Sequence, residues 1–286
     1  MAKILDGKLI SSEVKTQLKD KVSCFKEKYS REITLAVILV GENPASQVYV
    51  KNKIKAAELV GIKSLAYYLD ENSSQSQVEE LVVSLANDSA VDGILVQLPL
   101  PKGLDEDKIL SLIPAEKDVD GFLPENLGNL AMGKPSTVAC TPFGVIKMLK
   151  HENIDLCGKN AVVIGRSNIV GKPMAMLLLN ENCTVTICHS KTSDLKTVCK
   201  SADILVAAIG KPLFVTADMV KQGAVVVDVG INRTENGLVG DVDFQNVKEI
   251  ASYITPVPGG VGPMTIAMLM ENTYNCAVRR ENAKSF

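Results

Sequence analysis

The chain has 286 residues, of which 46% are hydrophobic and 22% are charged, and its formal net charge at pH 7 is −2. This composition is typical of a globular protein long enough for two domains, and it excludes a disordered chain. The slight excess of negative charge and the lack of tryptophan argue against nucleic acid as a main partner. Seven cysteines with no C-x-x-C pair and only two histidines argue against a zinc site, so we expect no metal.

The apolar runs and the N-terminal segment predict where the protein works. No apolar run reaches the roughly 20 residues that a membrane-spanning helix needs, so we expect no membrane partner. The opening segment MAKILDGKLISSEVK has neither the apolar stretch nor the cleavage site of a secretory signal peptide. We therefore expect a cytoplasmic protein.

Helix and strand patterns alternate through the first half of the chain. Apolar residues at helical spacing predict a helix over residues 12–29, and the continuous apolar run 35–40 predicts a buried parallel strand. Further elements are expected as a helix over 45–60, a strand over 63–68, a helix over 75–87 and a strand over 91–97. This βαβαβ order predicts a doubly wound parallel sheet.

The second half repeats the alternation after a less regular segment, 104–136, which we interpret as a connection that lines a cleft. The elements expected next are a helix over 143–150, strands at 161–164, 184–187, 204–208, 224–229 and near Tyr253, and a last helix over 264–278. The predicted fold class is α/β, with a cleft between two domains. The first is a three-layer substrate domain, residues 1–139, which the C-terminal helix 264–286 completes. The second is a Rossmann-like domain, residues 140–263.

A glycine-containing loop, Gly165-Arg166-Ser167-Asn168-Ile169-Val170-Gly171, joins a predicted strand to a predicted helix. A strand, a tight turn and a helix N-terminus together form an anion site, because backbone N–H groups and the helix dipole face the ligand. The loop departs from the usual G-x-G-x-x-G pattern, since Ser167 replaces the second glycine and the last glycine comes one residue late. The flanking strand and helix patterns favour a dinucleotide site over a purely structural turn.

The residues after the next predicted strand, Cys188-His189-Ser190-Lys191, indicate which dinucleotide binds. NAD sites carry an acidic residue here for the ribose 2′-hydroxyl, and this chain has none. Arg166 lies in the neighbouring loop, and a guanidinium group suits a phosphate dianion. The sequence therefore predicts NADP rather than NAD as the cofactor. Two alternatives remain, namely Arg166 as a solvated surface residue and His189 as a cap on the strand end.

Tyr49 and Lys53 are four residues apart on a predicted helix, so they share one face of it. The helix follows the first buried strand and Gln97 ends the third, so these residues lie at the sheet edge where α/β proteins bind ligands. Asp118 and Asp120 add carboxylates from the connecting segment. A base, an amide and an acid at one edge favour proton-transfer chemistry. Because Y-x-x-x-K is common in helices, a plain surface pair is the alternative.

These motifs, in this order, closely resemble the bifunctional methylenetetrahydrofolate dehydrogenase/cyclohydrolase family over essentially the whole chain. The motifs that carry the resemblance are Tyr49-x-x-x-Lys53, Gln97-Leu-Pro-Leu-Pro101, Pro114-x-x-Lys117-Asp118-Val119-Asp120-Gly121, Thr141-Pro142, Gly165-Arg166-Ser167-x-x-Val170-Gly171-x-Pro173 and Pro258-Gly-Gly-Val-Gly-Pro-Met-Thr265. The second, fifth and sixth motifs are highly specific when they occur together.

The resemblance implies a role for each candidate residue. It implies that Lys53 is the central catalytic residue and that Tyr49 and Gln97 support it. The implied substrate-binding residues, among which the aspartate would hold N–H groups of the pterin ring, are Tyr49, Asp120, Pro258, Gly259 and Gly260. The implied cofactor-binding residues are Gly165, Arg166, Ser167, Ser190 and Ile231. The resemblance also implies NADP as cofactor and a homodimer.

The implied activity has two steps on tetrahydrofolate derivatives. The enzyme would oxidise 5,10-methylenetetrahydrofolate to 5,10-methenyltetrahydrofolate with NADP and then hydrolyse the product to 10-formyltetrahydrofolate. Short-chain dehydrogenases are an alternative because they also use Tyr-x-x-x-Lys, but there the dinucleotide loop precedes the tyrosine, the reverse of the order here. A nucleotide-binding sensor without turnover is an alternative from a different class. A sensor of this kind would not need Lys53, Gln97 and Asp120 together at one cleft.

Overall fold

The computed structural model describes residues 1–134, 137–235 and 237–283. Contacts within the chain divide it into two compact units. The described residues of unit 1 are 1–12, 130–134, 139–235 and 237–265, and those of unit 2 are 13–129, 137–138 and 266–283. Each unit is built around a parallel sheet, so the predicted α/β class is confirmed.

The sheet of unit 2 has three parallel strands in the order β3-β2-β4. The strands are β2 (Thr34–Val40), β3 (Lys63–Leu69) and β4 (Gly93–Val96). β2 lies in the middle, and every one of its residues is buried. A strand buried on both faces needs an unbroken apolar run, which is the pattern that predicted this strand from the sequence.

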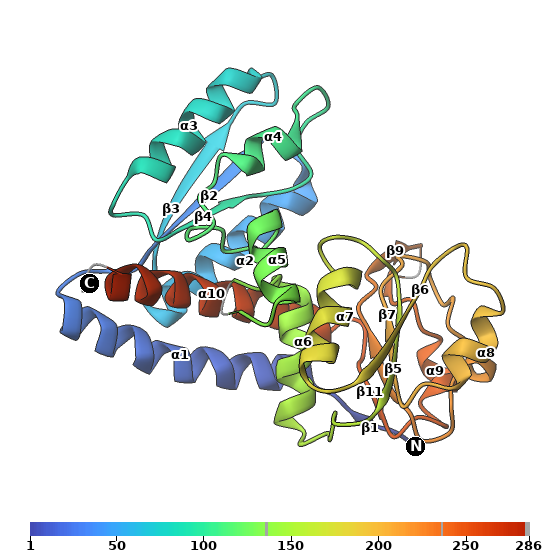
Figure 1. Cartoon of the computed structure of the whole chain (residues 1–286). Coiled ribbons are helices and arrows are strands. Elements are labelled where there is room, and N and C mark those ends of the chain that lie inside the picture. The colour runs from blue at the N-terminus through green and yellow to red at the C-terminus, as the bar shows by residue number, and fades with distance from the viewer. Residues whose placement is uncertain (135–136, 236, 284–286) are drawn as a thin grey trace. The chain divides into compact units, whose positions relative to one another are not determined.

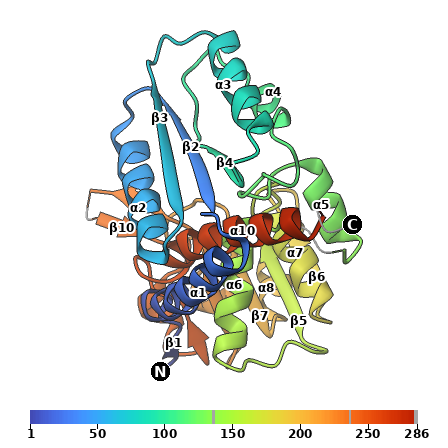
Figure 2. The same ribbon diagram turned by 90° about the vertical axis from the view of Figure 1, so that its left-hand side faces the viewer.

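Helices cover the sheet of unit 2. The helices that contribute residues to this unit are α1 (Gly7–Tyr29), α2 (Pro44–Val60), α3 (Gln75–Asn87), α4 (Glu106–Ser111), α5 (Pro124–Ala131) and α10 (Val261–Ala283). On one face of the sheet, Ile38 of β2 lies in an apolar cluster with Val82 of α3 and Ile109 of α4. α1 and α10 lie side by side (Figures 1 and 2), and the rings of Phe25 and Tyr274 meet there with centroids 6.4 Å apart.

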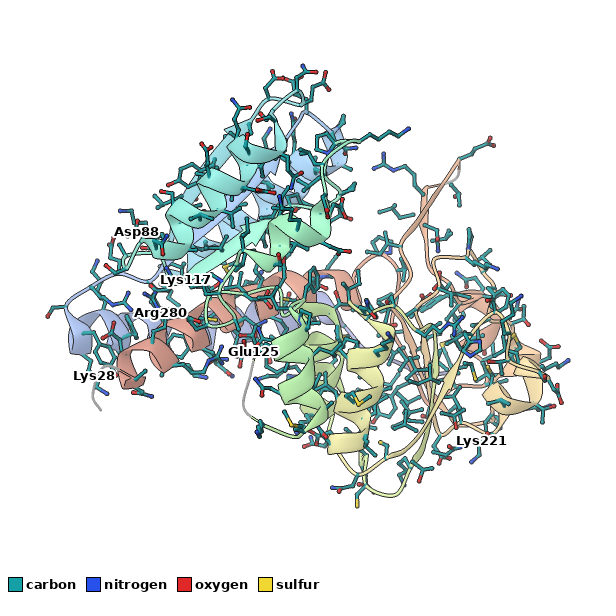
Figure 3. The ribbon with its side chains drawn as sticks, turned by 45° about the horizontal axis from the view of Figure 1, so that its top comes forward. Lys28, Asp88, Lys117, Glu125, Lys221 and Arg280 are labelled. Carbon is teal, nitrogen blue, oxygen red and sulfur yellow. The ribbon has the colours of Figure 1, made fainter. Side chains whose placement is uncertain are left out.

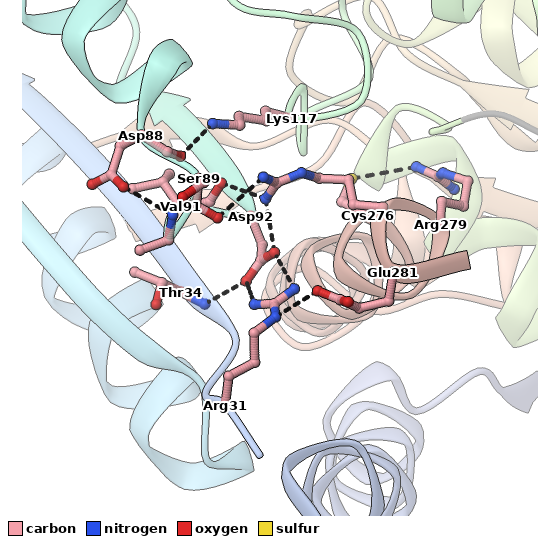
Figure 4. Close-up of polar contacts among 12 residues, drawn as sticks. Arg31, Thr34, Asp88, Ser89, Val91, Asp92, Lys117, Cys276, Arg279 and Glu281 are labelled. Atoms are coloured by element: carbon pink, nitrogen blue, oxygen red, sulfur yellow. Dashed lines mark hydrogen bonds and ion pairs between the residues drawn. The ribbon is translucent and has the colours of Figure 1, made fainter. Parts of the chain in front are cut away.

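Asp92, immediately before β4, is fully buried and joins three segments of unit 2 (Figure 4). Its Oδ2 accepts hydrogen bonds from Arg31 Nη1 at 2.8 Å and from the Thr34 N–H at 3.0 Å. Its Oδ1 accepts from Arg31 Nη2 and from Arg280 Nη1, both at 2.9 Å. Arg31 Nε also donates to Glu281 at 2.7 Å. One carboxylate therefore ties the start of β2 and the start of β4 to the end of α10.

Lys117 caps the C-terminal end of α3 from a buried position, and Figure 3 shows it beside Asp88. Its Nζ donates to the backbone carbonyls of Leu85 at 3.1 Å, Ala86 at 2.7 Å and Asp88 at 2.7 Å. Burial lowers the pKa of Lys117. The carbonyl oxygens at a helix C-terminus carry partial negative charge, so they offset the loss of hydration of the ammonium group. Lys117 thereby fixes the chain directly before Asp118.

The sheet of unit 1 has six parallel strands in the order β1-β11-β8-β7-β5-β6 (Figure 1). The strands are β1 (Lys3–Ile4), β5 (Asn160–Ile164), β6 (Thr184–Cys188), β7 (Ile204–Ala207), β8 (Val225–Asp228) and β11 (Tyr253–Ile254). β6 lies on one side of β5 and β7 on the other. Connections that leave in opposite directions create a crevice at the carboxyl ends of the strands, where open α/β sheets bind ligands.

Short helices and a hairpin complete unit 1 around an apolar core. The core includes Val162 of β5, Leu205 of β7 and Val226 of β8, all fully buried. The remaining elements are α6 (Cys140–His151), α7 (Gly171–Asn180), α8 (Leu195–Lys200), the 3₁₀ helix η1 (Ala217–Met219), α9 (Phe244–Val247), and the antiparallel strands β9 (Asn232–Thr234) and β10 (Gly237–Val239).

The N-terminus belongs to the sheet of unit 1. In β1, Lys3 pairs with Tyr253 and Ile4 with Ile254 of β11, and for this reason residues 1–12 group with unit 1. A strand of two residues carries no periodic pattern, so the sequence gives no sign of this pairing. The sequence had assigned these residues to the substrate domain.

Some elements differ from those predicted. The segment 104–136, interpreted as an irregular connection, contains α4 and α5, and its last two residues lie outside the described part. α10 begins at Val261 rather than at 264. The sequence pattern places the helix start after Pro263, but proline is tolerated in the first turn of a helix, so the helix includes it. Residues 284–286 of the expected final helix also lie outside the described part. In the stretches 1–134, 137–235 and 237–283, no helix combines the length and the hydrophobicity needed to cross a bilayer.

We expect the substitution Asp92→Asn to destabilise unit 2, because the side chain shared by two arginines and a backbone N–H loses its negative charge and one of its two acceptor oxygens. Removing one partner of a buried ion pair is costly, and with allowance for the partial exposure of Arg31 we expect a loss of about 2 kcal/mol in unfolding free energy. Urea unfolding followed by far-ultraviolet circular dichroism measures this loss. Glu32→Gln is the matched control, since it breaks only the exposed Lys26–Glu32 pair. Equal midpoints for the two variants contradict this role of Asp92.

Candidate functional site

α2 carries the first two candidate residues and begins directly after β2. Asn43 caps the helix, because its Oδ1 accepts the N–H groups of Ala45 at 3.0 Å and Ser46 at 3.1 Å. Pro44 is the first helical residue, a position where its missing N–H costs nothing. These local signals set the register of α2, so that Tyr49 and Lys53 lie one turn apart. Tyr49 is 46% exposed, so its ring is accessible from solvent.

The structure brings Lys53 and Gln97 together at the carboxyl edge of the three-stranded sheet. Lys53 Nζ donates to Gln97 Oε1 at 2.9 Å. Gln97 follows β4, and its backbone N–H donates to the carbonyl of Ile38 at 2.9 Å. Gln97 Nε2 donates to its neighbour, the Leu98 carbonyl, at 2.6 Å. This second bond fixes the orientation of the amide, so the oxygen and not the NH₂ group faces the lysine.

Asp120 lies in a turn that a second aspartate holds. Asp118 is buried, and its carboxylate accepts the N–H groups of Gly121 and Leu123, each at 3.0 Å, and Asn126 Nδ2 at 2.9 Å. The turn therefore closes around Asp118 and leaves Asp120 to present its own carboxylate. Sequence reasoning noted Asp118 only as an added carboxylate and missed Asn126. The Asp-x-Asp-Gly sequence itself is a turn signal that could have suggested this cap.

The Asp120 carboxylate has an environment opposite to that of Asp118. Among the residues that the structure describes, no hydrogen bond holds it, and it interacts electrostatically with Lys53. Burial raises the pKa of Asp120 to about 6, Lys53 acts in the opposite direction, and Asp118 adds to the rise. Asp120 therefore changes charge close to neutral pH. Lys53, Gln97 and Asp120 supply an ammonium, a fixed acceptor and an ionisable carboxyl group at one edge.

The glycine loop of unit 1 forms the tight turn that the sequence predicted. Gly165 has φ +126°, and a Cβ there would lie 2.2 Å from the carbonyl oxygen of Ala208, so only glycine fits. Ser167 Oγ accepts the N–H groups of Val170 at 3.2 Å and Gly171 at 3.3 Å, where α7 begins. The Ser167 hydroxyl therefore closes the turn that leads into α7, which gives a physical reason for a serine at the position of the second glycine in G-x-G-x-x-G.

A pocket of about 320 Å³ lies at the carboxyl ends of β5, β6 and β7. Gly165, Arg166, His189 and Ser190 line one side of it, so the structure brings these predicted residues together. The His189 Nδ1 accepts the Lys191 N–H at 3.1 Å. His189 therefore holds the turn at the end of β6 and also borders the pocket. Both predicted roles, a cap on the strand end and a residue near the cofactor, are compatible with this position. The tight approach at Gly165 and the arginine fit a dinucleotide with a phosphorylated ribose.

Ile231 lies after β8 and is 49% exposed. Asp228, the last residue of β8, accepts the N–H groups of Gly230 at 3.0 Å, Asp241 at 2.8 Å and Val242 at 2.9 Å. Burial raises the pKa of Asp228 to about 6, while these N–H groups act in the opposite direction. Asp228 therefore fixes the chain on which Ile231 sits, a role that sequence reasoning missed.

The Pro258-Gly259-Gly260 segment packs against the first turn of α1. The Lys8 N–H donates to the carbonyl of Gly259 at 3.1 Å. A Cβ on Gly7 would lie 1.7 Å from the Gly260 carbonyl oxygen, so the two backbones touch. This contact requires a glycine at position 7, and a Cβ on Gly260 would itself lie 2.6 Å from the carbonyl oxygen of Pro256. Backbone packing therefore accounts for both glycines, and the implied role of Pro258, Gly259 and Gly260 in ligand binding stays a prediction. Within the described ranges, no cluster of three His, Cys, Asp or Glu side chains is arranged to hold a metal.

Comparisons with known proteins agree with both halves of this description. The catalytic domain of tetrahydrofolate dehydrogenase/cyclohydrolase matches residues 5–120, and the NAD(P)-binding domain of the same family matches residues 139–281. A bifunctional protein FolD from Agathobacter rectalis is 60% identical over 280 residues, which cover 98% of this chain and 100% of the relative.

Solved structures give the same result. A bifunctional FolD methylenetetrahydrofolate dehydrogenase/cyclohydrolase from Campylobacter jejuni has a TM-score of 0.95 and 54% identity, covering 98% of this chain and 100% of its own. A Trypanosoma brucei FolD, complexed with NADP cofactor and inhibitor, has a TM-score of 0.92 and 38% identity, covering 98% of each chain. These matches confirm the family predicted from the motifs: the chain belongs to the tetrahydrofolate dehydrogenase/cyclohydrolase family.

Proposed function

We propose that this protein is a bifunctional one-carbon folate enzyme. It oxidises 5,10-methylenetetrahydrofolate to 5,10-methenyltetrahydrofolate with NADP and hydrolyses the product to 10-formyltetrahydrofolate. Membership of the family supports both steps. The observation that carries the proposal is the Lys53–Gln97 hydrogen bond at 2.9 Å, with Asp120 in electrostatic reach of the same lysine.

The dehydrogenase step depends on unit 1. When bound, NADP supplies the acceptor for the hydride that leaves the one-carbon bridge of the folate. Gly165 lets the chain approach the pyrophosphate closely, and the N-terminus of α7 adds favourable backbone dipoles. Arg166 and Ser190 supply donors for the 2′-phosphate, and Ile231 contributes an apolar surface. These residues bind and orient, and they take no part in bond making.

The hydrolysis step depends on unit 2. Water adds to the methenyl carbon, the bond from that carbon to N5 breaks, and one proton is released. Lys53 accepts the proton from the attacking water when its amine is neutral, and it returns a proton to the departing nitrogen. Gln97 keeps Nζ in place through its fixed Oε1. Tyr49, one turn earlier on α2, packs beside the substrate and supports the lysine.

Asp120 binds the pterin ring in this proposal. A carboxylate presents two acceptor oxygens, which suit the adjacent N–H groups of a pterin. Its carboxylate keeps these oxygens available because Asp118, and not Asp120, caps the turn. Pro258, Gly259 and Gly260 are proposed as further substrate-binding residues on the strength of the family motif.

We also propose the domain boundaries, the oligomeric state and the cellular location of the protein. The folate-binding domain comprises the chain up to residue 139 and the C-terminal helix from residue 264, except that residues 1–12, which carry β1, group with the NADP-binding domain, residues 140–263. The grouping of residues 266–283 with unit 2 supports the assignment of the final helix. The active form is proposed to be a cytoplasmic homodimer without nucleic-acid or membrane partners, in keeping with its composition and small net charge.

The proposal predicts formation of NADPH when the purified protein receives 5,10-methylenetetrahydrofolate and NADP. Absorbance of the reduced cofactor follows the first step, and loss of absorbance of methenyltetrahydrofolate follows the second. A nucleotide-binding sensor would bind NADP but turn over neither folate. Absence of both reactions in folded protein rejects the proposed function.

We expect Lys53→Met to fold normally and to lose cyclohydrolase activity by at least about 100-fold, because general acid–base groups contribute factors of this size. Lys51→Met is the matched control, since this exposed lysine lies on the same helix and has no contact with Gln97. Circular dichroism confirms folding, and hydrolysis of methenyltetrahydrofolate gives the rate. Retained hydrolysis in the Lys53 variant would remove that lysine from the mechanism.

We expect folate binding to weaken below pH 6, because Asp120 then gains a proton and loses acceptor capacity. Its pKa in the folded protein is about 6, so the carboxylate is charged above this pH and neutral below it. The KM for methenyltetrahydrofolate, measured from pH 5 to 7.5, should rise as the pH falls. Asp120→Ala should raise this KM about tenfold at pH 7.5 and abolish the pH dependence, whereas exposed Asp107→Ala should change neither. An unchanged profile in Asp120→Ala places the pterin carboxylate elsewhere.

We expect the wild-type protein to prefer NADP over NAD. Loss of the Arg166 guanidinium in Arg166→Ala should raise the KM for NADP by about tenfold, because a charge-assisted contact to the 2′-phosphate is lost. The KM for NAD, which lacks this phosphate, should change little. Steady-state kinetics with both cofactors provide the measurement, and a strong NAD preference in the wild type contradicts the assignment.

A further inference from the structure

The pocket at the carboxyl ends of β5, β6 and β7 has a second side that the family motifs do not cover. This side comes mainly from residues 209–214, the segment after β7, which we call the β7 loop. Its pocket-lining residues are Ile209, Lys211 and Phe214, and Leu195 of α8 lies with them. Lys211 Nζ lies 5.6 Å from the centroid of the Phe214 ring. An ammonium group therefore borders the same pocket as Arg166 and Ser190, from a different part of the chain.

A buried carboxylate fixes the backbone of the β7 loop. Asp241 is fully buried, and its Oδ2 accepts the N–H groups of Ile209 at 2.7 Å and Gly210 at 3.0 Å. Its Oδ1 accepts the Lys211 N–H at 2.8 Å and Asn232 Nδ2 at 2.9 Å. Three successive N–H groups thus converge on one side chain. The Cα of Lys211 has a defined place, and only its long side chain is free to meet a ligand.

Backbone hydrogen bonds also fix the C-terminal end of the β7 loop. The Leu213 N–H donates to the carbonyl of Gly240 at 3.0 Å, and the Val215 N–H donates to the carbonyl of Asp241 at 2.9 Å. Leu213 has φ +53°, a left-handed conformation that a branched side chain adopts only when its surroundings impose it. Such imposed strain occurs most often at ligand sites. Phe214, the residue directly after Leu213, lines the wall of the pocket.

The charged side chains that line the pocket are cations. Arg166 and Lys211 bring two cations, and Ser190 brings a hydroxyl donor. None of the lining residues that the structure describes carries a carboxylate. The apolar side chains of Leu195, Ile209 and Phe214 form the rest of the wall. A ligand that matches this lining has a flat apolar part and a compact dianion at its edge, which are the features of an adenosine 2′-phosphate.

We propose that Lys211 is a specificity-determining residue that binds the 2′-phosphate of NADP, with Phe214 against the adenine and Asp241 as the positioning residue of the β7 loop. This inference rests on the proposed use of NADP. It extends that proposal, because the β7 loop then adds a second cation to the pocket that Arg166 lines. Two cations that contact a dianion discriminate against NAD more strongly than one, since each contact is made only when the phosphate is present.

The test measures binding and turnover of Lys211→Ala with ligands that differ only in the 2′-phosphate. Titration calorimetry with 2′,5′-ADP and with 5′-AMP reports the nucleotide pocket without any folate. We expect the affinity for 2′,5′-ADP to fall about tenfold and the weak affinity for 5′-AMP to stay unchanged. In kinetics, the KM for NADP should rise about tenfold at unchanged kcat, and the KM for NAD should not move. Lys211→Arg should restore most of the preference.

Lys191→Ala is the matched control, because Lys191 follows Ser190 directly but does not line the pocket. An equal loss of affinity for NADP and NAD in Lys211→Ala would place Lys211 at the pyrophosphate or the adenine and overturn the proposal. An unchanged ratio of NADP to NAD in an active variant would overturn it as well. Failure of the proposed function is a separate result, since it appears as a wild-type protein that forms no NADPH from methylenetetrahydrofolate.

Discussion

Buried aspartates that accept several N–H groups hold the loops on which both units depend. Loops at the ends of a sheet carry backbone N–H groups with no partner in the ladder, and leaving one buried and unpaired costs about 1–3 kcal/mol. In this chain one carboxylate satisfies two or three such donors at a time. The aspartates with this role are Asp118 in unit 2 and Asp228 and Asp241 in unit 1. Each one fixes a turn that carries a residue assigned to ligand binding.

The same principle separates the two aspartates of the Asp118-Val119-Asp120 sequence. Asp118 is surrounded by donors and holds the backbone, whereas Asp120 has no hydrogen-bond donor among the described residues and interacts electrostatically with Lys53. Burial without donors favours the neutral acid, which is why the pKa of Asp120 lies near 6. Neighbouring residues of one type therefore differ in environment, since one holds the turn and the other keeps the ionisable carboxyl group that we propose binds the pterin ring.

The sequence predicted those parts of the structure that are encoded locally. The apolar run of β2, the capping residues of α2 and the spacing of Tyr49 and Lys53 all act within a few residues, so their outcome could be read directly. The cap made by Asp241 could not, because its backbone donors lie about thirty residues away in the chain, whereas the donors around Asp118 are local and the Asp-x-Asp-Gly sequence offered a signal for them. Lys211 could not be predicted for the same reason, because its position at the pocket depends on a hydrogen bond to the distant Asp241 side chain. Motif order identified the family, but long-range hydrogen bonds decide how each site is built.

The pairing of β1 with β11 has a consequence for how the chain matures. In unit 1, Lys3 pairs with Tyr253 of β11. In unit 2, Arg31 binds Glu281, and Arg31 and Arg280 share the carboxylate of Asp92. Contacts of such long sequence separation form late and slow the search for the native state. During synthesis, neither unit can close until the ribosome has produced nearly the whole chain. Lys3 and Arg31 therefore lack these partners for most of translation, and a fragment that ends in the middle of the chain completes neither unit.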